Sequence, residues 1–320
     1  MSFANLRLST VNSRFLERIA HRNYYLAKLY YAYLFQFENL LDKDPLIIYQ
    51  MGKVGSSSVV ASLQTLGVKT PTFHVHTLVE AHRRQAETRL NLSPRLYFKR
   101  SKNALISRYL EKEINRSKGQ EIGSFNKKWK VITLVRDPMA QNISSFFQVI
   151  DLYITDFFKR YESKTLQVKD LTELFLEQYS PDCIFNNWFD LEMKSVFGID
   201  VYANKFPKSK GYEIYRGKWA DLLLLRLENL SQCASEAFNE YLGIENFRLI
   251  NKNIAHDKKY NLAYKEFKNT VELPDAHIDS IYKLKQVQHF YTDEEIQGFK
   301  ARLKHGGEQL KYERPANPFK

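Results

Sequence analysis

The sequence has little cysteine, and its two cysteines, Cys183 and Cys233, have no metal-ligand spacing around them. A disulfide-rich secreted fold and a structural zinc site are therefore not expected. Apolar runs of 18 or more residues are absent, and the N-terminus has no signal-peptide pattern. We accordingly predict no transmembrane segment.

A G-x-x-x-x-G-K-[ST] motif is also missing. Zinc-finger, RNP and basic-zipper patterns are missing as well, although the net charge is +12 and the pI is near 9.4. The basic residues are spread along the chain, so we expect no nucleic-acid partner. The charge indicates an anionic ligand, an acidic glycan or an anionic surface.

The most informative segment that is present is LIIYQMGKVGSSSVVASLQ, residues 46–64. Four apolar or aromatic residues predict a short buried strand, and Gly52 and Gly55 flank Lys53 before Ser56, Ser57 and Ser58 begin an amphipathic helix. The first turn of such a helix has unpaired N–H groups and a partial positive charge, which favour phosphate binding. An ordinary turn with a serine N-cap is the alternative.

A second segment, KVITLVRDPMAQNISSFF, covers residues 130–147. Its β-branched run ends at Arg136, and Ser144 lies eight residues later in the helix that follows. Both side chains can reach one anion at the carboxyl end of a parallel strand. Two phosphate sites indicate a nucleotide phosphorylated at two places, unless Arg136 instead pairs with Asp137 or Glu228.

These two segments resemble the cofactor motifs of sulfotransferases that use 3′-phosphoadenosine 5′-phosphosulfate, PAPS. A third segment, LLLLRLENLS at residues 222–231, resembles a later core strand of that family. WFDLEMKSVFGIDVY at residues 188–202, with QHFYTDEEI, is similar to bacterial capsular polysaccharide synthesis proteins. Together the resemblances extend over residues 45–304. Golgi members of the family have a membrane anchor, so we expect a bacterial cytoplasmic enzyme, with peripheral membrane contact as an option.

The resemblance implies that the N–H groups of Val54, Gly55, Ser56, Ser57 and Ser58 bind the 5′-phosphate. It also implies that Arg136 and Ser144 bind the 3′-phosphate, and that Lys53 stabilises the leaving oxygen without a metal. Cytosolic relatives have a serine in place of Val54 and an adenine-stacking tryptophan in place of Ser58. An NTP-binding loop is less favoured, because its lysine follows the last loop glycine whereas Lys53 precedes Gly55.

Candidates for the general base are His76 and His74, which alternation places on one face at the end of a strand. A core histidine pair and a two-histidine metal pair are the alternatives. Glu80 and His82 are further candidates. The basic NKNIAHDKK segment, residues 251–259, could replace the phosphate-binding loop that the cytosolic family has near its C-terminus.

The predicted fold is α/β, with a central parallel sheet flanked by helices. Residues 1–44 are expected to form a helical segment docked on the core, and residues 45–320 one sulfotransferase-like domain. We predict further short strands at residues 198–202 and 212–215, a core strand at residues 222–227, and a mostly helical remainder. Arg226 and Glu228 are expected to form a buried pair.

The predicted function is transfer of a sulfuryl group from PAPS to a hydroxyl of a glycan, polysaccharide or glycolipid, with adenosine 3′,5′-bisphosphate as the product. The alternative is a capsular polysaccharide assembly protein that does not sulfate, or another nucleotide-binding protein. The sequence does not predict the acceptor or the oligomeric state.

Overall fold

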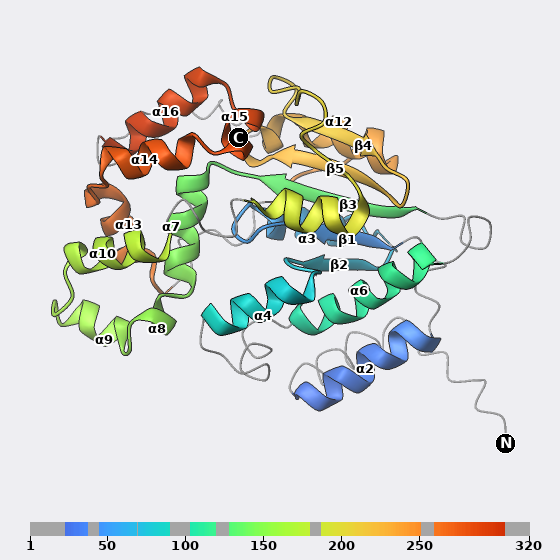
Figure 1. Ribbon diagram of the computed structural model, residues 1–320, viewed down its shortest axis with the longest axis horizontal. Coiled ribbons are helices and arrows are strands. Elements are labelled where there is room, and N and C mark those ends of the chain that lie inside the picture. The colour runs from blue at the N-terminus through green and yellow to red at the C-terminus, as the bar shows by residue number, and fades with distance from the viewer. Residues whose placement is uncertain are drawn as a thin grey trace.

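A five-stranded sheet forms the centre of the fold (Figure 1). The computed structural model describes residues 23–37, 45–68, 70–89, 103–119, 128–179, 187–250 and 259–304. The strands are β1 (Leu46–Tyr49), β2 (Thr72–Val75), β3 (Trp129–Val135), β4 (Tyr212–Arg216) and β5 (Ala220–Arg226). All residues of β1 and β5 are buried. Such continuous apolar burial is typical of parallel strands covered on both faces.

The strand order is β2-β1-β3-β5-β4, and only β4 runs antiparallel to its neighbour among these strands. The chain leaves β1 towards β2 at one side, whereas it leaves β3 towards β5 at the other. The carboxyl ends of β1 and β3 therefore flank a topological switch point, which is where open α/β sheets bind ligands. The prediction of an α/β fold with a central, mostly parallel sheet is confirmed.

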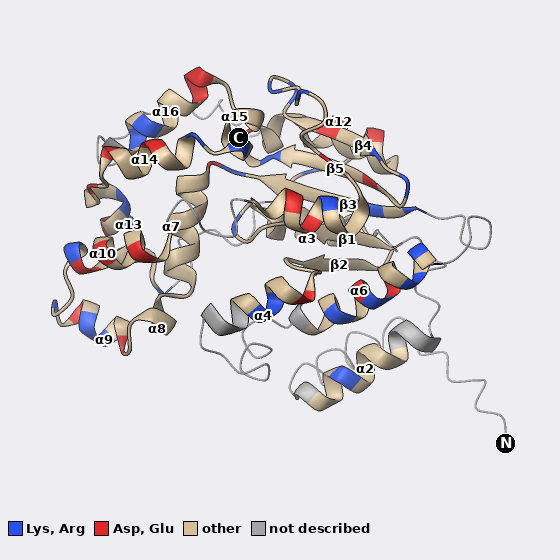
Figure 2. Cartoon of the chain, viewed as in Figure 1, with Lys and Arg blue, Asp and Glu red and all other residues tan. Residues whose placement is uncertain are grey.

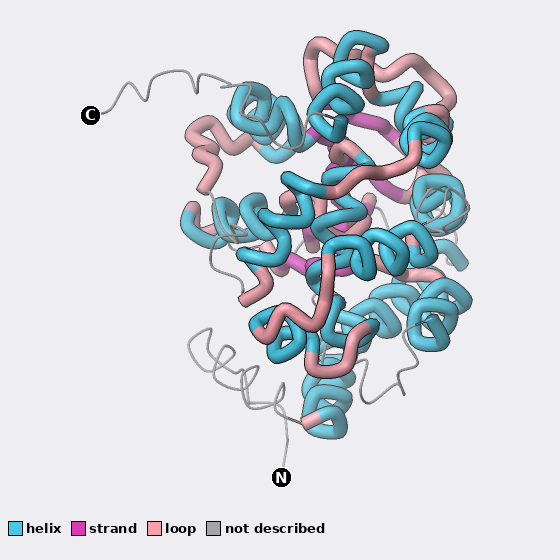
Figure 3. The backbone as a smooth tube through the Cα atoms, turned by 90° about the vertical axis from the view of Figure 1, so that its left-hand side faces the viewer, coloured by secondary structure: helices cyan, strands magenta, loops and turns pink. Residues whose placement is uncertain are grey.

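Helices surround the strands, as the view of Figure 3 also shows. The first part of the chain forms α2 (Tyr24–Phe37), α3 (Ser56–Thr65), α4 (Glu80–Arg89) and α6 (Asn103–Gly119). The middle part forms α7 (Pro138–Gln148), α8 (Ile150–Tyr153), α9 (Phe157–Glu162), α10 (Val168–Gln178), the π-helix η3 (Phe189–Lys194), α11 (Ser195–Phe197) and the 3-10 turn η4 (Leu227–Asn229). The last part forms α12 (Leu230–Leu242), α13 (Asn261–Thr270), α14 (Asp275–Tyr282), α15 (Lys285–Phe290) and α16 (Asp293–Lys304).

Helix α2 packs against α6 beside the β2 side of the sheet (Figure 1). Ala27 and Tyr31 are buried in this contact, and the Tyr109 hydroxyl donates to the carbonyl of Lys28. Leu26 and Leu29 point outwards and are exposed. Within the described ranges, no helix has both the length and the apolar character needed to cross a membrane.

The predicted strand at residues 198–202 is wrong, because this stretch forms turns. Asp200 accepts a hydrogen bond from the N–H of Tyr202 at 3.0 Å and pairs with Lys194 at 2.7 Å. A carboxylate that binds the backbone two residues later favours a turn over an extended ladder. Ile199 and Val201 still bury their side chains in the core.

The predicted pair of Arg226 with Glu228 is also wrong. Arg226 is fully buried and pairs with Glu295 of α16, while its Nη1 donates to the carbonyl of Lys208 at 2.9 Å. The other oxygen of Glu295 accepts from the N–H of Thr292 at 2.9 Å and so caps α16. The end of β5 is thereby fastened to the C-terminal helices.

Candidate functional site

The loop between β1 and α3 has the shape of a phosphate-binding loop. Lys53 and Gly55 both adopt left-handed backbone conformations, with φ of 68° and 88°. Gly55 is the N-cap of α3, and no side chain caps the first turn. The N–H of Ser58 donates to the carbonyl of Gly55 at 3.1 Å, so the N–H groups of Ser56 and Ser57 are those that an anion could reach. A Cβ at Gly55 would lie 2.4 Å from Cδ1 of Leu227. The backbone of Gly55 therefore packs closely against Leu227, and its left-handed conformation favours glycine.

Two side chains from the β3 side of the switch point bind this loop. Nη1 of Arg136 donates to the carbonyl of Lys53 at 3.0 Å, and Nε2 of Gln141 donates to the carbonyl of Gly52 at 2.9 Å. Arg136 follows β3 directly, and Gln141 lies in the first turn of α7. The two segments that the sequence singled out therefore meet at the carboxyl edge of the sheet.

A cluster of basic side chains surrounds Arg136. Partial desolvation lowers the pKa of Lys268 on α13, and the positive charges of Arg136 and of Arg302 on α16 lower it further. Asp137 lies in the same cluster, and its pKa is raised mainly because burial disfavours the carboxylate. We call Arg136, Lys268 and Arg302 the basic cluster. Glu228 is a second carboxylate at this place, because its Oε1 accepts from the N–H of Asp137 at 2.8 Å. Figure 2 shows that Lys and Arg are mixed with Asp and Glu on several of the described helices.

The remaining predicted cofactor residues lie along the same edge. Val54 is fully buried, Ser56 is buried, and Ser57 and Ser58 are half-buried in the first turn of α3. Ser144 is half-buried in α7, two turns beyond Arg136. The segment 251–258, considered above as a replacement phosphate loop, lies outside the described residues.

His74 and His76 form a polar cluster with Gln50 and Ser56. Nε2 of His74 lies 3.0 Å from both the Gln50 amide nitrogen and the Ser56 hydroxyl. The same amide nitrogen also lies 3.3 Å from Nδ1 of His76. Nδ1 of His76 lies 3.1 Å from the carbonyl oxygen of Gln50, to which it donates. Both imidazoles thus adjoin the phosphate-binding loop, as the strand pattern predicted.

Burial and the neighbouring His76 lower the pKa of His74 to about 3, and burial lowers the pKa of His76 as well. An unfolded histidine titrates near pH 6.5. As the pH falls from about 6.5 towards 3, the unfolded chain therefore binds a proton at His74 that the folded chain does not. The free energy of unfolding should decrease over this range and should be fully retained above it.

The replacement His74→Gln tests this linkage, because glutamine retains an amide for Ser56 but does not titrate. Below pH 6.5 we expect the free energy of unfolding to fall less steeply with pH in the variant than in the wild type. The slopes should differ by about 1.4 kcal/mol per pH unit, which corresponds to about one bound proton. Urea unfolding at about pH 7 and about pH 5 measures the difference. Parallel losses in the two proteins would mean that folded His74 is protonated.

The other two candidate bases differ sharply in their surroundings. Glu80 is an exposed residue that pairs with Arg84 at 2.7 Å, and this hydrogen bond lowers its pKa. His82, in the first turn of α4, places Nδ1 at 2.6 Å from Oε1 of Glu192. Glu192 lies on the π-helix η3 and is 1% exposed. No sequence pattern had indicated Glu192, Lys268 or Arg302, since each comes from a segment distant from the two motifs.

Comparison with known families gives one match. Residues 161–292 match a family model, NKWYS, described as putative capsular polysaccharide synthesis protein. No curated protein and no solved structure matches the chain. The matched segment contains η3, β4, β5 and α13, and with them Glu192 and Lys268. The chain is therefore similar to capsular polysaccharide synthesis proteins over this segment, which leaves out the β1–α3 loop and Arg136.

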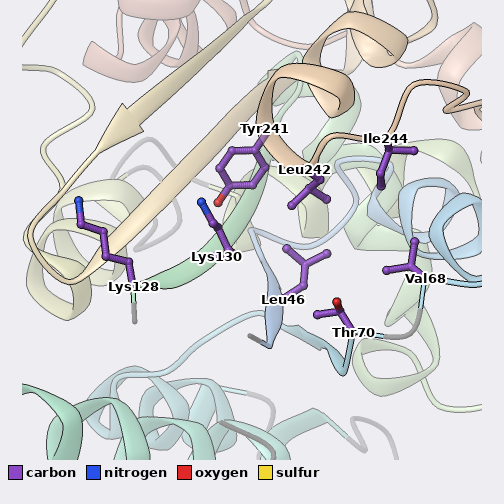
Figure 4. Close-up of a pocket in the computed structure, with 8 residues that line it drawn as sticks. All are labelled: Leu46, Val68, Thr70, Lys128, Lys130, Tyr241, Leu242 and Ile244. Carbon is purple, nitrogen blue, oxygen red and sulfur yellow. The ribbon is translucent and has the colours of Figure 1, made fainter. Parts of the chain in front are cut away.

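A cavity of about 300 Å³ lies at the opposite, amino-terminal edge of the sheet (Figure 4). Leu46, Val68, Leu242 and Ile244 supply apolar walls, and Lys128, Lys130, Thr70 and Tyr241 supply polar groups. Both lysines pair with Asp221, at 3.6 and 2.9 Å, and the Tyr241 hydroxyl donates to main-chain carbonyls. Since the two lysines and Tyr241 already have partners and the cavity lies at the edge away from the switch point, we assign the candidate site to the carboxyl edge.

Proposed function

We propose that this protein is a PAPS-dependent sulfotransferase that acts on a hydroxyl of a glycan, polysaccharide or glycolipid. One observation carries the proposal: the β1–α3 loop and Arg136 meet at the switch point of a parallel sheet. A helix N-terminus there suits a 5′-phosphate, and the basic cluster suits a second phosphate. The family match over residues 161–292 supports a carbohydrate acceptor.

In this proposal the N–H groups of residues 54–57 bind the 5′-phosphate, whereas the predicted N–H of Ser58 already donates to the carbonyl of Gly55 at 3.1 Å. Lys53 stabilises negative charge on the bridging oxygen as the sulfuryl group departs. Arg136, with Ser144, binds the 3′-phosphate, and Lys268 and Arg302 add positive charge around it. The fit is supported by the left-handed Gly55, which permits close approach of the backbone to an anion.

His74 and His76 were expected to include the general base. Burial lowers the pKa of both imidazoles, to about 3 for His74, and this makes them weaker proton acceptors. We therefore propose that both contact the substrate from beside Ser56. In this proposal the base is another group at this edge of the sheet.

The rival function, capsular polysaccharide assembly without sulfation, is favoured by the family description alone. Binding of adenosine 3′,5′-bisphosphate separates the two. A ligand at 100 times its Kd stabilises a protein by about 2.7 kcal/mol, which shifts the melting temperature measurably. The absence of any shift at millimolar bisphosphate would remove the support for the sulfotransferase.

Replacing Arg136 by alanine should weaken binding of the bisphosphate about 10- to 100-fold more than binding of adenosine 5′-phosphate. The reason is that a hydrogen bond to a charged group contributes about 1.5–3 kcal/mol, and only the bisphosphate has the 3′ group. Calorimetric titration with both nucleotides measures the two affinities.

Gln141→Ala is the matched control for Arg136→Ala. It also removes a side chain that holds the loop, at Gly52, but it removes no charge. Equal weakening of the two nucleotides is expected in this variant. If Arg136→Ala behaves in the same way, Arg136 acts only on the shape of the loop.

A further inference from the structure

The contacts of Glu192 are those of a carboxylate with a fixed orientation. Its Oε2 accepts from the Tyr49 hydroxyl and from the N–H groups of Leu78 and Val79, at 2.9 and 3.1 Å for the two amides. Its Oε1 faces Nδ1 of His82. All four donors converge on a side chain that is almost completely buried. A buried carboxyl group with this many donors is held in one orientation.

His82 differs from Glu192 in its exposure. Its side chain keeps 15% exposure, compared with 1% for Glu192, so the imidazole lies between the buried carboxylate and the surface. Nδ1 must be protonated to donate to Glu192, which leaves Nε2 as the acceptor atom of the neutral ring. A carboxylate in this position fixes the tautomer and stabilises the imidazolium that forms on proton uptake.

The pair lies at the same edge of the sheet as the phosphate-binding loop. Tyr49, which donates to Glu192, is the last residue of β1, and Leu78 and Val79 connect the end of β2 to α4. Strands β1 and β2 are hydrogen-bonded neighbours, so their carboxyl ends are about 5 Å apart. The π-helix η3 supplies Glu192, and π-turns are frequent at functional sites.

We propose that His82, oriented by Glu192, is the proton acceptor of the candidate site at the carboxyl edge of the sheet. This inference rests on the proposed function, in which the proton comes from the acceptor hydroxyl. The hydroxyl oxygen forms a bond to sulfur while the bond from sulfur to the 5′-phosphate oxygen breaks, and the electron pair of the broken bond stays on that oxygen beside Lys53. The hydroxyl proton passes to Nε2 of His82 and then to water. Glu192 is a positioning residue.

The first test uses the tautomer and does not depend on activity. Nitrogen-15 spectra of histidine-labelled protein, with His82→Asn to assign the signal, should show His82 protonated at Nδ1 and free at Nε2. In the Glu192→Gln variant the proton should move to Nε2 of His82. The amide oxygen of the glutamine can accept from the three donors that Oε2 of Glu192 serves, while its NH₂ group donates to Nδ1 of His82. A wild-type His82 that is protonated at Nε2 would overturn the proposal.

The second test uses turnover, measured with labelled PAPS and heparosan, an unsulfated acidic polysaccharide. His82→Asn retains a donor for Glu192 and lacks Nε2, so kcat should fall about 10²- to 10⁴-fold. Glu192→Gln should lower kcat about 10²-fold or more through the wrong tautomer. Both variants should bind the bisphosphate within about twofold of the wild type, because the proton acceptor acts on the acceptor hydroxyl.

A control separates the chemistry from folding. Gln85→Asn makes the same kind of change at an exposed position of α4, and it should keep kcat within about threefold. Full turnover in His82→Asn would overturn the proposal, and a large kcat loss in His76→Gln alone would assign the proton to His76. If the wild type does not bind the bisphosphate, the sulfotransferase proposal is refuted. The tautomer spectra would then still show whether Glu192 orients His82.

Discussion

Lys53→Ala should abolish sulfuryl transfer while the protein still binds adenosine 3′,5′-bisphosphate. The main-chain N–H groups of the loop and Arg136 remain, so nucleotide affinity should fall by about tenfold at most. The leaving oxygen, however, loses its positive partner. Removing one such electrostatic group typically costs about 10²- to 10³-fold in kcat. Transfer from labelled PAPS and titration with the bisphosphate measure the two quantities separately.

The backbone conformation of Lys53 suggests a second variant, which should be more stable than the wild type. A non-glycine residue with φ of 68° is strained, at a cost of order 1 kcal/mol. Lys53→Gly should therefore raise the free energy of unfolding by about that amount and abolish transfer equally. Activity within about threefold of the wild type in either variant would show that Lys53 does not stabilise the leaving group.

Gly55→Ala should damage the loop itself. The φ of 88° is unfavourable for alanine by about 1–2 kcal/mol. The added Cβ would also lie 2.4 Å from the side chain of Leu227, which has to move. We expect a loss of about 2 kcal/mol or more in the free energy of unfolding, together with at least about tenfold weaker bisphosphate binding.

Gly52→Ala is the control in the same loop. Gly52 has no positive φ, and a Cβ there meets no atom of the structure within 4 Å. Its stability and its bisphosphate affinity should stay close to those of the wild type. Equal behaviour of the two alanine variants would contradict the close approach at Gly55.

The sequence was sufficient to predict the parts of the site that are local. A strand, two glycines around a lysine and a helix start lie within 20 residues, so the β1–α3 loop follows from short-range rules. Arg136 could be placed for the same reason, because it ends a β-branched strand next to Pro138. His74 and His76 were placed correctly at the end of β2 by simple alternation.

The groups that tertiary structure brings together could not be predicted in this way. Glu192 is one of three charged residues in the segment FDLEMK, residues 189–194, and its partner His82 precedes it by 110 residues. Lys268 and Arg302 lie on helices whose approach to β3 depends on how the C-terminal region packs. The same limit explains the error at Arg226, whose partner Glu295 is 69 residues away whereas Glu228 is two. Proximity in sequence favoured the wrong carboxylate.

The hydrogen bonds from Arg136 and Gln141 to the loop have a consequence for the rates of ligand exchange. They fix the carbonyls of Lys53 and Gly52 before any nucleotide arrives, so binding does not have to order the loop. Association should then be limited by diffusion and by the electrostatic attraction of the basic cluster, and it should slow as salt screens that attraction. Release of the product bisphosphate breaks charged contacts, and its rate should therefore rise with ionic strength.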